Sequence, residues 1–385
     1  MQDISMYFAP ISAELEAISG EGTLGEKMVK NDSSGFPEIQ NKSVALIYVP
    51  EYRRLTGSNG ATNESFRKSL YTLYAGDVWI RQIYDLGTIR PGETIQDTYY
   101  ALTQVVTELA KAQVIPIVIG GGQDLTLACY KGFEPLEQMV NICSIDHSLD
   151  IGDPNEDPTA HGYVSHLLMQ RPCNLFNFAN IGMQRPKVKK KEIELFEKLY
   201  FDFCRLGEFM DDFKKAEPHL RNSDILSIDF GSIKGVESDP SVYSQPNGFS
   251  ASQICQLSKY AGISDKLACF GVFNVDPNHN KNAAALLAEM IWYFLDGVHT
   301  RMGDFPIGSK IDYKKFIVHL DDFQDDLIFY KSPKSGRWWM EVKYPMNEGS
   351  KYERHHLVPC DEQDYHNTLE NDVPDLWWKT LQKLS

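Results

Sequence analysis

The chain has 385 residues and a formal net charge of −15 at pH 7, and 42% of its residues are hydrophobic. This composition is typical of a folded globular protein with one large domain and additions, or with two domains. The excess of acidic residues argues against nucleic-acid binding, and the sequence has no apolar run of about 18 residues that could cross a membrane. The seven cysteines are scattered without a C-x-x-C pair, and the N-terminus lacks the basic start of a signal peptide. We therefore expect reduced thiols and a cytoplasmic location.

The first 42 residues are polar and predict a partly helical arm. From Val44 onward, apolar strand patterns alternate with helical patterns, which predicts βαβ units and a parallel sheet. Most of these strands are apolar throughout, as expected of strands covered on both faces by helices. A helix is predicted over residues 93–111, where apolar residues recur at steps of three and four, and a second over residues 282–297. Seven strand candidates begin at Val44, Trp79, Val114, Asn141, Phe176, Asp224 and Cys269.

The pattern changes near residue 305. Residues 306–385 read as strands joined by a Ser-Pro-Lys-Ser-Gly turn and followed by a terminal helix. Four of the six tryptophans lie here: Trp338, Trp339, Trp377 and Trp378. They either dock a small extension on the main domain or form a surface for a partner. The predicted organisation is an arm (residues 1–42), a three-layer α/β/α domain with a mostly parallel sheet of about seven or eight strands (43–305), and a C-terminal extension with a β-hairpin and a terminal helix (306–385).

Three predicted strands end in polar clusters: "GGGQDLT" at residues 120–126, "SIDHSLD" at 144–150 and "SIDFGS" at 227–232. Because ligands collect at the carboxyl ends of parallel strands, we expect Asp146, Asp150 and Asp229 to meet there. Three ionised carboxylates in one cleft repel each other. The site therefore holds a cation, keeps a proton, or recruits hydrogen bonds and a basic residue such as Lys234.

The order of these motifs resembles the ureohydrolase superfamily, which contains arginase, agmatinase and formiminoglutamase. The family's strand ends read G-G-[DG]-H-[SE], D-A-H-x-D and S-x-D-x-D-x-x-D-P. Further similar segments are "GSNGATNESFR" from Gly57, "YDLGTI" from Tyr84, "AHGYVSHLL" from Ala160 and "FNVDP" from Phe273. The resemblance covers about residues 44–300 and implies an arginase-like fold. It also implies hydrolysis of guanidino or formimino C–N bonds by a water that bridges two manganese ions.

The sequence departs from the family at half of the metal-binding positions. Asp146, Asp150 and Asp229 match, whereas Gln123, Ser148 and Gly231 replace the other three ligands. The resemblance thus implies one remaining site whose ligands are Gln123, Asp146, Asp150 and Asp229. An all-oxygen set suits Mn²⁺, Mg²⁺ or Ca²⁺. A pair of manganese ions is not expected.

The resemblance also assigns roles around the metal. His161 stands at the family's His-Gly position, so His161 and Asp150 are the catalytic candidates. Asn274 replaces the acid that grips the substrate, so Asn274 and Ser148 are the substrate-binding candidates. His147 lies one residue from a ligand position, and on a regular strand it would point to the opposite face. The basic run Lys187 to Lys191 is interpreted as a solvated helix start.

These features predict an arginase- and formiminoglutamase-family protein that lacks authentic ureohydrolase catalysis, a pseudoenzyme. It would bind a small molecule in the strand-end cleft, and its aromatic C-terminal extension would contact a second copy or another protein. The alternative is a divergent hydrolase that cuts C–N bonds of linear amidines with a single metal ion. Neither a nucleic acid nor a membrane is an expected partner.

Overall fold

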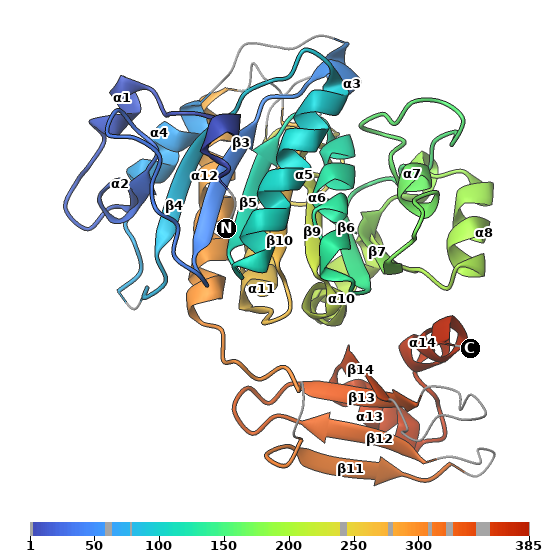
Figure 1. Ribbon diagram of the computed structural model, residues 1–385. Coiled ribbons are helices and arrows are strands. Elements are labelled where there is room, and N and C mark those ends of the chain that lie inside the picture. Colours follow the sequence, from blue (N-terminus) through green and yellow to red (C-terminus); the bar gives the residue numbers. More distant parts are fainter. Residues whose placement is uncertain are drawn as a thin grey trace.

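The computed structural model describes residues 3–57, 64–77, 79–238, 245–275, 280–306, 310–320, 326–343 and 355–384. These residues form a ten-stranded sheet covered by helices and a separate four-stranded sheet at the C-terminal end (Figure 1). All seven cysteines are free thiols. Among the described helices, none has both the length and the apolar character needed to cross a membrane.

The large sheet is parallel apart from one edge strand, β1, which runs antiparallel to β4. Its order is β1-β4-β3-β5-β10-β9-β6-β7-β8, with β2 also paired to β4. The seven predicted strands are present, as β3 Val44–Val49, β4 Ile83–Ile89, β5 Ile115–Gly120, β6 Val140–Ile145, β7 Leu175–Met183, β9 Ile225–Asp229 and β10 Cys269–Phe273. Three short strands were not predicted: β1 Phe8–Ala9, β2 Val29–Lys30 and β8 Asp202–Arg205.

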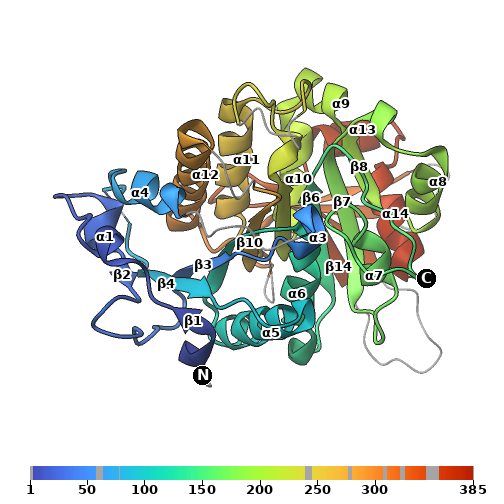
Figure 2. The same cartoon turned by 90° about the horizontal axis from the view of Figure 1, so that it is seen from above.

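Helices cover both faces of this sheet, as the apolar strands predict (Figure 2). The apolar side chains of one face pack on α5 Ile95–Lys111, α6 Thr126–Lys131, α7 Val164–Leu168 and α8 Lys190–Lys198. Those of the other face pack on α4 Ser65–Tyr71, α9 Leu206–Asp211, α10 Glu217–Asn222, α11 Ala251–Ile263 and α12 Lys281–His299. The remaining helices of this part are short: α1 Ala13–Glu16, α2 Leu24–Lys27 and α3 Arg53–Thr56.

Helices α11 and α12 pack closely because glycines face each other where they meet. A Cβ at Gly297 would lie 2.4 Å from the carbonyl oxygen of Lys259 and 2.9 Å from the Cα of Gly262. The helix continues past Gly297 to His299, so the prediction that it ends at this glycine is wrong. Gly297 serves a close helix contact instead of a helix end.

A fully buried ion pair ties α4 to β4. The guanidinium of Arg67 donates from Nε and Nη2 to the two oxygens of Asp85, at 2.8 and 3.0 Å, and the hydroxyl of Tyr71 donates to the same carboxylate. Arg67 and Asp85 both lie in segments on which the family resemblance rests. Their contact gives those segments a structural role, because removing one partner would leave the other charge buried.

The C-terminal extension has its own sheet and core. Antiparallel strands β11 Lys314–Val318, β12 Leu327–Lys331, β13 Trp338–Lys343 and β14 His355–Cys360 pair in chain order, followed by α13 Glu362–Leu369 and α14 Asp375–Leu384. The predicted turn closes with a hydrogen bond from the N–H of Gly336 to the carbonyl of Ser332. Trp338 and Trp377 belong to the core of the extension.

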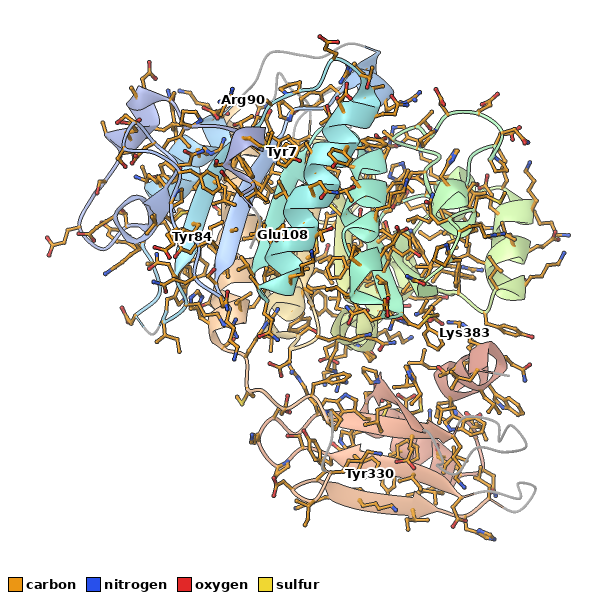
Figure 3. The ribbon with its side chains drawn as sticks, in the orientation of Figure 1. Tyr7, Tyr84, Arg90, Glu108, Tyr330 and Lys383 are labelled. Carbon is orange, nitrogen blue, oxygen red and sulfur yellow. The ribbon has the colours of Figure 1, made fainter. Side chains whose placement is uncertain are left out.

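The extension docks at the amino ends of the main strands, below the large sheet in Figure 1. Buried Arg221 of α10 donates to the carbonyl oxygens of Trp338 and Cys360, at 2.9 and 2.7 Å. From α14, Lys379 pairs with Asp202 and Lys383 donates to Asn177, and Figure 3 shows Lys383 between α14 and the main domain. The carboxyl ends of the main strands lie at the opposite end of the sheet.

Candidate metal and ligand site

The carboxyl ends of β6 and β9 bring three acidic residues together. The two strands are neighbours in the sheet, with Ile145 opposite Ile228. Asp146 follows the last residue of β6, and Asp229 is the last residue of β9. Asp150 lies on the loop after β6 with a left-handed backbone (φ 48°). This backbone conformation is uncommon for residues other than glycine. Contacts with the surrounding residues must therefore hold Asp150 in it.

Each of the three carboxylates accepts hydrogen bonds with one oxygen and leaves the other without a hydrogen-bond donor. Ser148 donates to the Oδ1 of Asp146 from its N–H and hydroxyl, and the hydroxyl also lies 2.6 Å from the Oδ1 of Asp150. The Oδ1 of Asp229 accepts from the N–H of Gly231 and from Asn274. The Oδ2 atoms of Asp146, Asp150 and Asp229 are buried without a hydrogen-bond partner in the structure.

His147 joins this cluster, so the prediction that it points to the opposite face is wrong. Its Nδ1 lies 3.4 Å from the Oδ1 of Asp146 and 3.2 Å from the Oδ2 of Asp229, without hydrogen-bond alignment. Ligand atoms of Asp146, His147 and Asp229 lie within 4.8 Å of one another. The strand ends at Ile145, so side chains beyond it need not alternate between the two faces.

Burial and mutual repulsion make this cluster electrostatically unfavourable on its own. Burial, followed by the charges of Asp150 and Asp229, raises the pKa of Asp146 well above its ordinary value. Burial also raises the pKa of Asp150. Burial would raise the pKa of Asp229 too, but His147 holds it below the usual range. Among the described residues, no lysine or arginine lies within ion-pair distance of these aspartates, so Lys234 is not their partner.

The arrangement fits one cation. The carboxylates of Asp146 and Asp229 and the imidazole of His147 lie close enough together to share an ion, and carboxylate and imidazole ligands together suit Mn²⁺ among the divalent cations. The residues do not fit the family's second ion equally well. The hydroxyl of Ser148 is engaged with two carboxylates, and Gly231 supplies only a backbone N–H.

Gln123 and Asn274 lie side by side in a buried layer next to the cluster. The amide nitrogen of Gln123 donates to the hydroxyls of Ser144 and Ser227. The Oδ1 of Asn274 accepts from the N–H of Gln123, while its Nδ2 donates to Asp229 at 3.0 Å. The side chain of Asn274 thus orients Asp229. A direct role of Gln123 in metal binding, or of Asn274 in substrate binding, stays a prediction.

A cavity of about 360 Å³ opens above the cluster. His147, Ser148, Asp150, Asp229 and Gly231 line its inner part. The exposed His161, which precedes α7, lies on its wall and faces Asp150 closely enough to favour the ionised carboxylate. Three of the predicted site residues, Asp150, Ser148 and His161, therefore line the same space as Asp229.

Sequence reasoning missed one wall of this cavity. Lys187, Lys189, Glu192 and Gln245 line it, and the Nζ of Lys187 donates to the side-chain oxygen of Gln245. The basic run after β7 was interpreted as a solvated helix start. The position of this run in the sequence could have indicated its place at the site. It follows β7, which lies next to β6, and the two parallel strands end at the same edge of the sheet.

The fold is a mostly parallel sheet between two layers of helices, with acidic side chains at the carboxyl ends of its strands. Proteins of this α/β class bind ligands at that edge of the sheet. Within this class, the Arginase family model matches residues 56–296. The chain therefore belongs to the arginase family.

The chain is also similar to individual proteins of this family. A formimidoylglutamase of Clostridium tetani is 23% identical over 275 residues, which cover 64% of this chain and 79% of the relative. The crystal structure of formimidoylglutamase from Bacillus subtilis covers 69% of this chain and 90% of its own, with 16% identity and a TM-score of 0.63. A Trypanosoma cruzi formiminoglutamase with Mn²⁺ has 19% identity and a TM-score of 0.60, covering 69% of this chain and 97% of its own. At these identities the solved structures bear out the fold.

Proposed function

We propose that this arginase-family protein binds one divalent cation between Asp146, His147, Asp150 and Asp229, and a small polar ligand in the cavity above it. One observation carries the proposal: ligand atoms of Asp146, His147 and Asp229 lie within 4.8 Å of one another. Each of these two carboxylates, and that of Asp150 on the adjoining loop, also buries an oxygen that has no hydrogen-bond partner among the described residues. Buried charges without partners are costly, and a bound cation would offset this cost. The two-ion ureohydrolase reaction does not fit, because Ser148 and Gly231 stand at positions of the second ion's ligands.

The residues of the chain divide the work at such a site. A bound cation would polarise a ligand oxygen and lower the pKa of a bound water. Ser148 holds Asp146 and Asp150 in place, and Asn274 and Gly231 hold Asp229. Lys187 and Lys189 add positive charge to the lining of the cavity, where Lys189 also pairs with Glu192. The cavity thus favours a ligand with two separate groups. One group is positively charged or binds the metal, and the other is negatively charged.

A second candidate is a hydrolase that cuts the C–N bond of a linear amidine with this single ion. Two observations favour it: His161 lies on the cavity wall, where it could transfer a proton, and the relatives described above include formimidoylglutamases. In this reading Asp150 and His161 are the catalytic pair.

Turnover separates the two candidates. The protein with Mn²⁺ is incubated with formiminoglutamate, agmatine and arginine, and formamide, ammonia and urea are measured. The first proposal predicts no product above that of the Asp229→Asn variant, together with stabilisation of the wild-type chain by Mn²⁺ that the variant lacks. Formation of product that depends on Mn²⁺, Asp229 and His161 would contradict the first proposal and support the hydrolase. Absence of both product and Mn²⁺ stabilisation would refute both.

A further inference from the structure

A second cavity lies at the opposite end of the main sheet from the carboxylate cluster. Its volume is about 720 Å³, and residues at the amino ends of β4, β3, β5 and β10 line it. These are four adjacent strands. The C-terminal extension docks beside it, at the amino ends of β7 and β8 and on α10. The cavity therefore belongs to the main domain.

Positive charge is concentrated in this cavity although the chain is acidic overall. One acidic side chain lines it, Asp265, beside five basic ones: Lys42, Arg81, Lys111, Lys266 and Arg301. Two of the five have carboxylate partners, because Lys111 pairs with Glu108 and Lys266 with Asp224. The carboxylate of Asp265 accepts the backbone N–H groups of residues 303 and 304.

The other three cations, Lys42, Arg81 and Arg301, lack a carboxylate within ion-pair distance among the described residues. Arg301 donates from Nε and Nη2 to backbone carbonyls at residues 262 and 267, a usual role for a cation near helix ends. Among the described residues, Arg81 donates from Nη1 alone, to the carbonyl of Lys42. Burial, and then the charge of Arg81, lower the pKa of Arg301 to about 10. The two guanidinium groups thus repel each other, and the charge of Asp265 offsets this repulsion only in part.

The remaining wall is apolar apart from Gln113 and Gln138. Phe133 and Leu267 are buried, and Leu136 is half-buried beside them. A cavity that combines an apolar wall with a few convergent charged groups is typical of a small-molecule site. We propose that this cavity binds a small organic anion whose phosphate or carboxylate group lies between Lys42, Arg81 and Arg301 and whose apolar part contacts Phe133 and Leu136. Arginine is well suited to phosphate and carboxylate groups because it can bind two oxygens at once.

Calorimetric titration with phenyl phosphate and inorganic phosphate tests this proposal. The full chain is freed of metal with a chelator and titrated at constant ionic strength. We expect saturable binding of one phenyl phosphate per chain, about tenfold or more tighter than phosphate because the ring contacts the apolar wall. Arg81→Gln should weaken phenyl phosphate about tenfold or more. Lys42→Gln, at an exposed position, tests the same site if the arginine variant does not fold.

Lys187→Gln is the matched control, since Lys187 lines the other cavity and should leave the affinity unchanged. Three results would overturn the proposal: no saturable binding of either phosphate, equal affinity for both, or binding that is lost in Lys187→Gln and kept in Arg81→Gln and Lys42→Gln. The last result would place the anion beside the carboxylate cluster. The proposal does not depend on the cation site, because the titration is done without metal.

Discussion

The carboxylate cluster carries a cost in stability that a bound cation, as proposed above, would offset. Asp146 is buried beside two other acids, and its raised pKa means that its ionisation costs free energy in the folded protein. This cost grows as the pH rises above the ordinary carboxyl pKa of about 4. Strained or repulsive groups of this kind are a common feature of functional sites.

Asp146→Asn should therefore stabilise the metal-free protein and abolish its response to Mn²⁺. The amide has the shape of the acid, can still accept from Ser148 and carries no charge. We expect the free energy of unfolding at pH 8 to rise by about 1–3 kcal/mol, as measured by urea denaturation. Asp312→Asn, at an exposed position of the extension, should leave both quantities unchanged. A destabilised variant, or one still stabilised by Mn²⁺, would contradict this interpretation.

At the residue scale, the order of the predicted strands was enough to place the acidic residues at one edge of the sheet. It did not predict which side chains they contact. Asp146 and Asp229 follow from neighbouring parallel strands, whose register places their ends together. His147 could not be placed in this way, because alternation ends with the strand and the loop geometry depends on Ser148 and Asn180. The layer of Gln123 and Asn274 depends on contacts between residues 151 positions apart.

At the scale of elements, the turn after β5 positions this buried layer. A Cβ at Gly121 would lie 1.8 Å from the carbonyl oxygen of Glu51, so the turn packs directly on the chain that follows β3. The carbonyl of Gly121 also accepts the N–H of Asn274. Only glycine allows backbones to approach this closely.

Gly121→Ala should destabilise the protein by roughly 2–4 kcal/mol, because the backbone must move to relieve the clash. Gly207→Ala is the matched control: a Cβ at this position of α9 meets nothing within 4 Å. Because alanine favours helix, the control should be neutral or stabilising by up to about 1 kcal/mol. Chemical denaturation of both variants measures the difference. Equal stability of the two would show that the turn tolerates a side chain.

The long elements were predicted from their periodicity and the short ones were not. Helix α5 begins with a capping box at Thr94 and Asp97, close to its predicted start. Strands β1, β2 and β8 have two to four residues each, too few for a pattern to stand out. Two of them lie in the first 42 residues, where apolar residues such as Phe8 and Leu15 are widely spaced yet buried in the core.

At the scale of the whole molecule, the position of the extension could not be predicted, because it depends on contacts between distant residues. Trp338 and Trp377 build the extension's own core, whereas Trp339 lies against the guanidinium of Arg221 at 4.8 Å. His356 of β14 faces the main domain and contacts the ring of Phe176. Its Nε2 is buried without a hydrogen-bond partner in the part of the chain that the structure describes, and Lys266 and Lys383 lie nearby.

Stability should therefore depend on pH through His356. Burial, and then these two lysines, lower the pKa of His356 to about 4, against about 6.5 for an unperturbed histidine. Between these values the unfolded chain binds more protons than the folded one, so stability falls as the pH falls. We expect the wild type to lose about 1–3 kcal/mol more than His356→Gln between pH 7 and pH 4.5. His366→Gln, at an exposed position of α13, should keep the wild-type dependence; parallel curves for wild type and His356→Gln would contradict the assignment.

The number of bound ions tests the central claim most directly. Native mass spectrometry of the full chain, equilibrated with Mn²⁺ and then freed of excess metal, counts the ions that remain. One ion per wild-type chain and none in Asp229→Asn are expected. Two ions per chain, or no ion at any Mn²⁺ concentration that leaves the protein folded, would contradict a single-cation site.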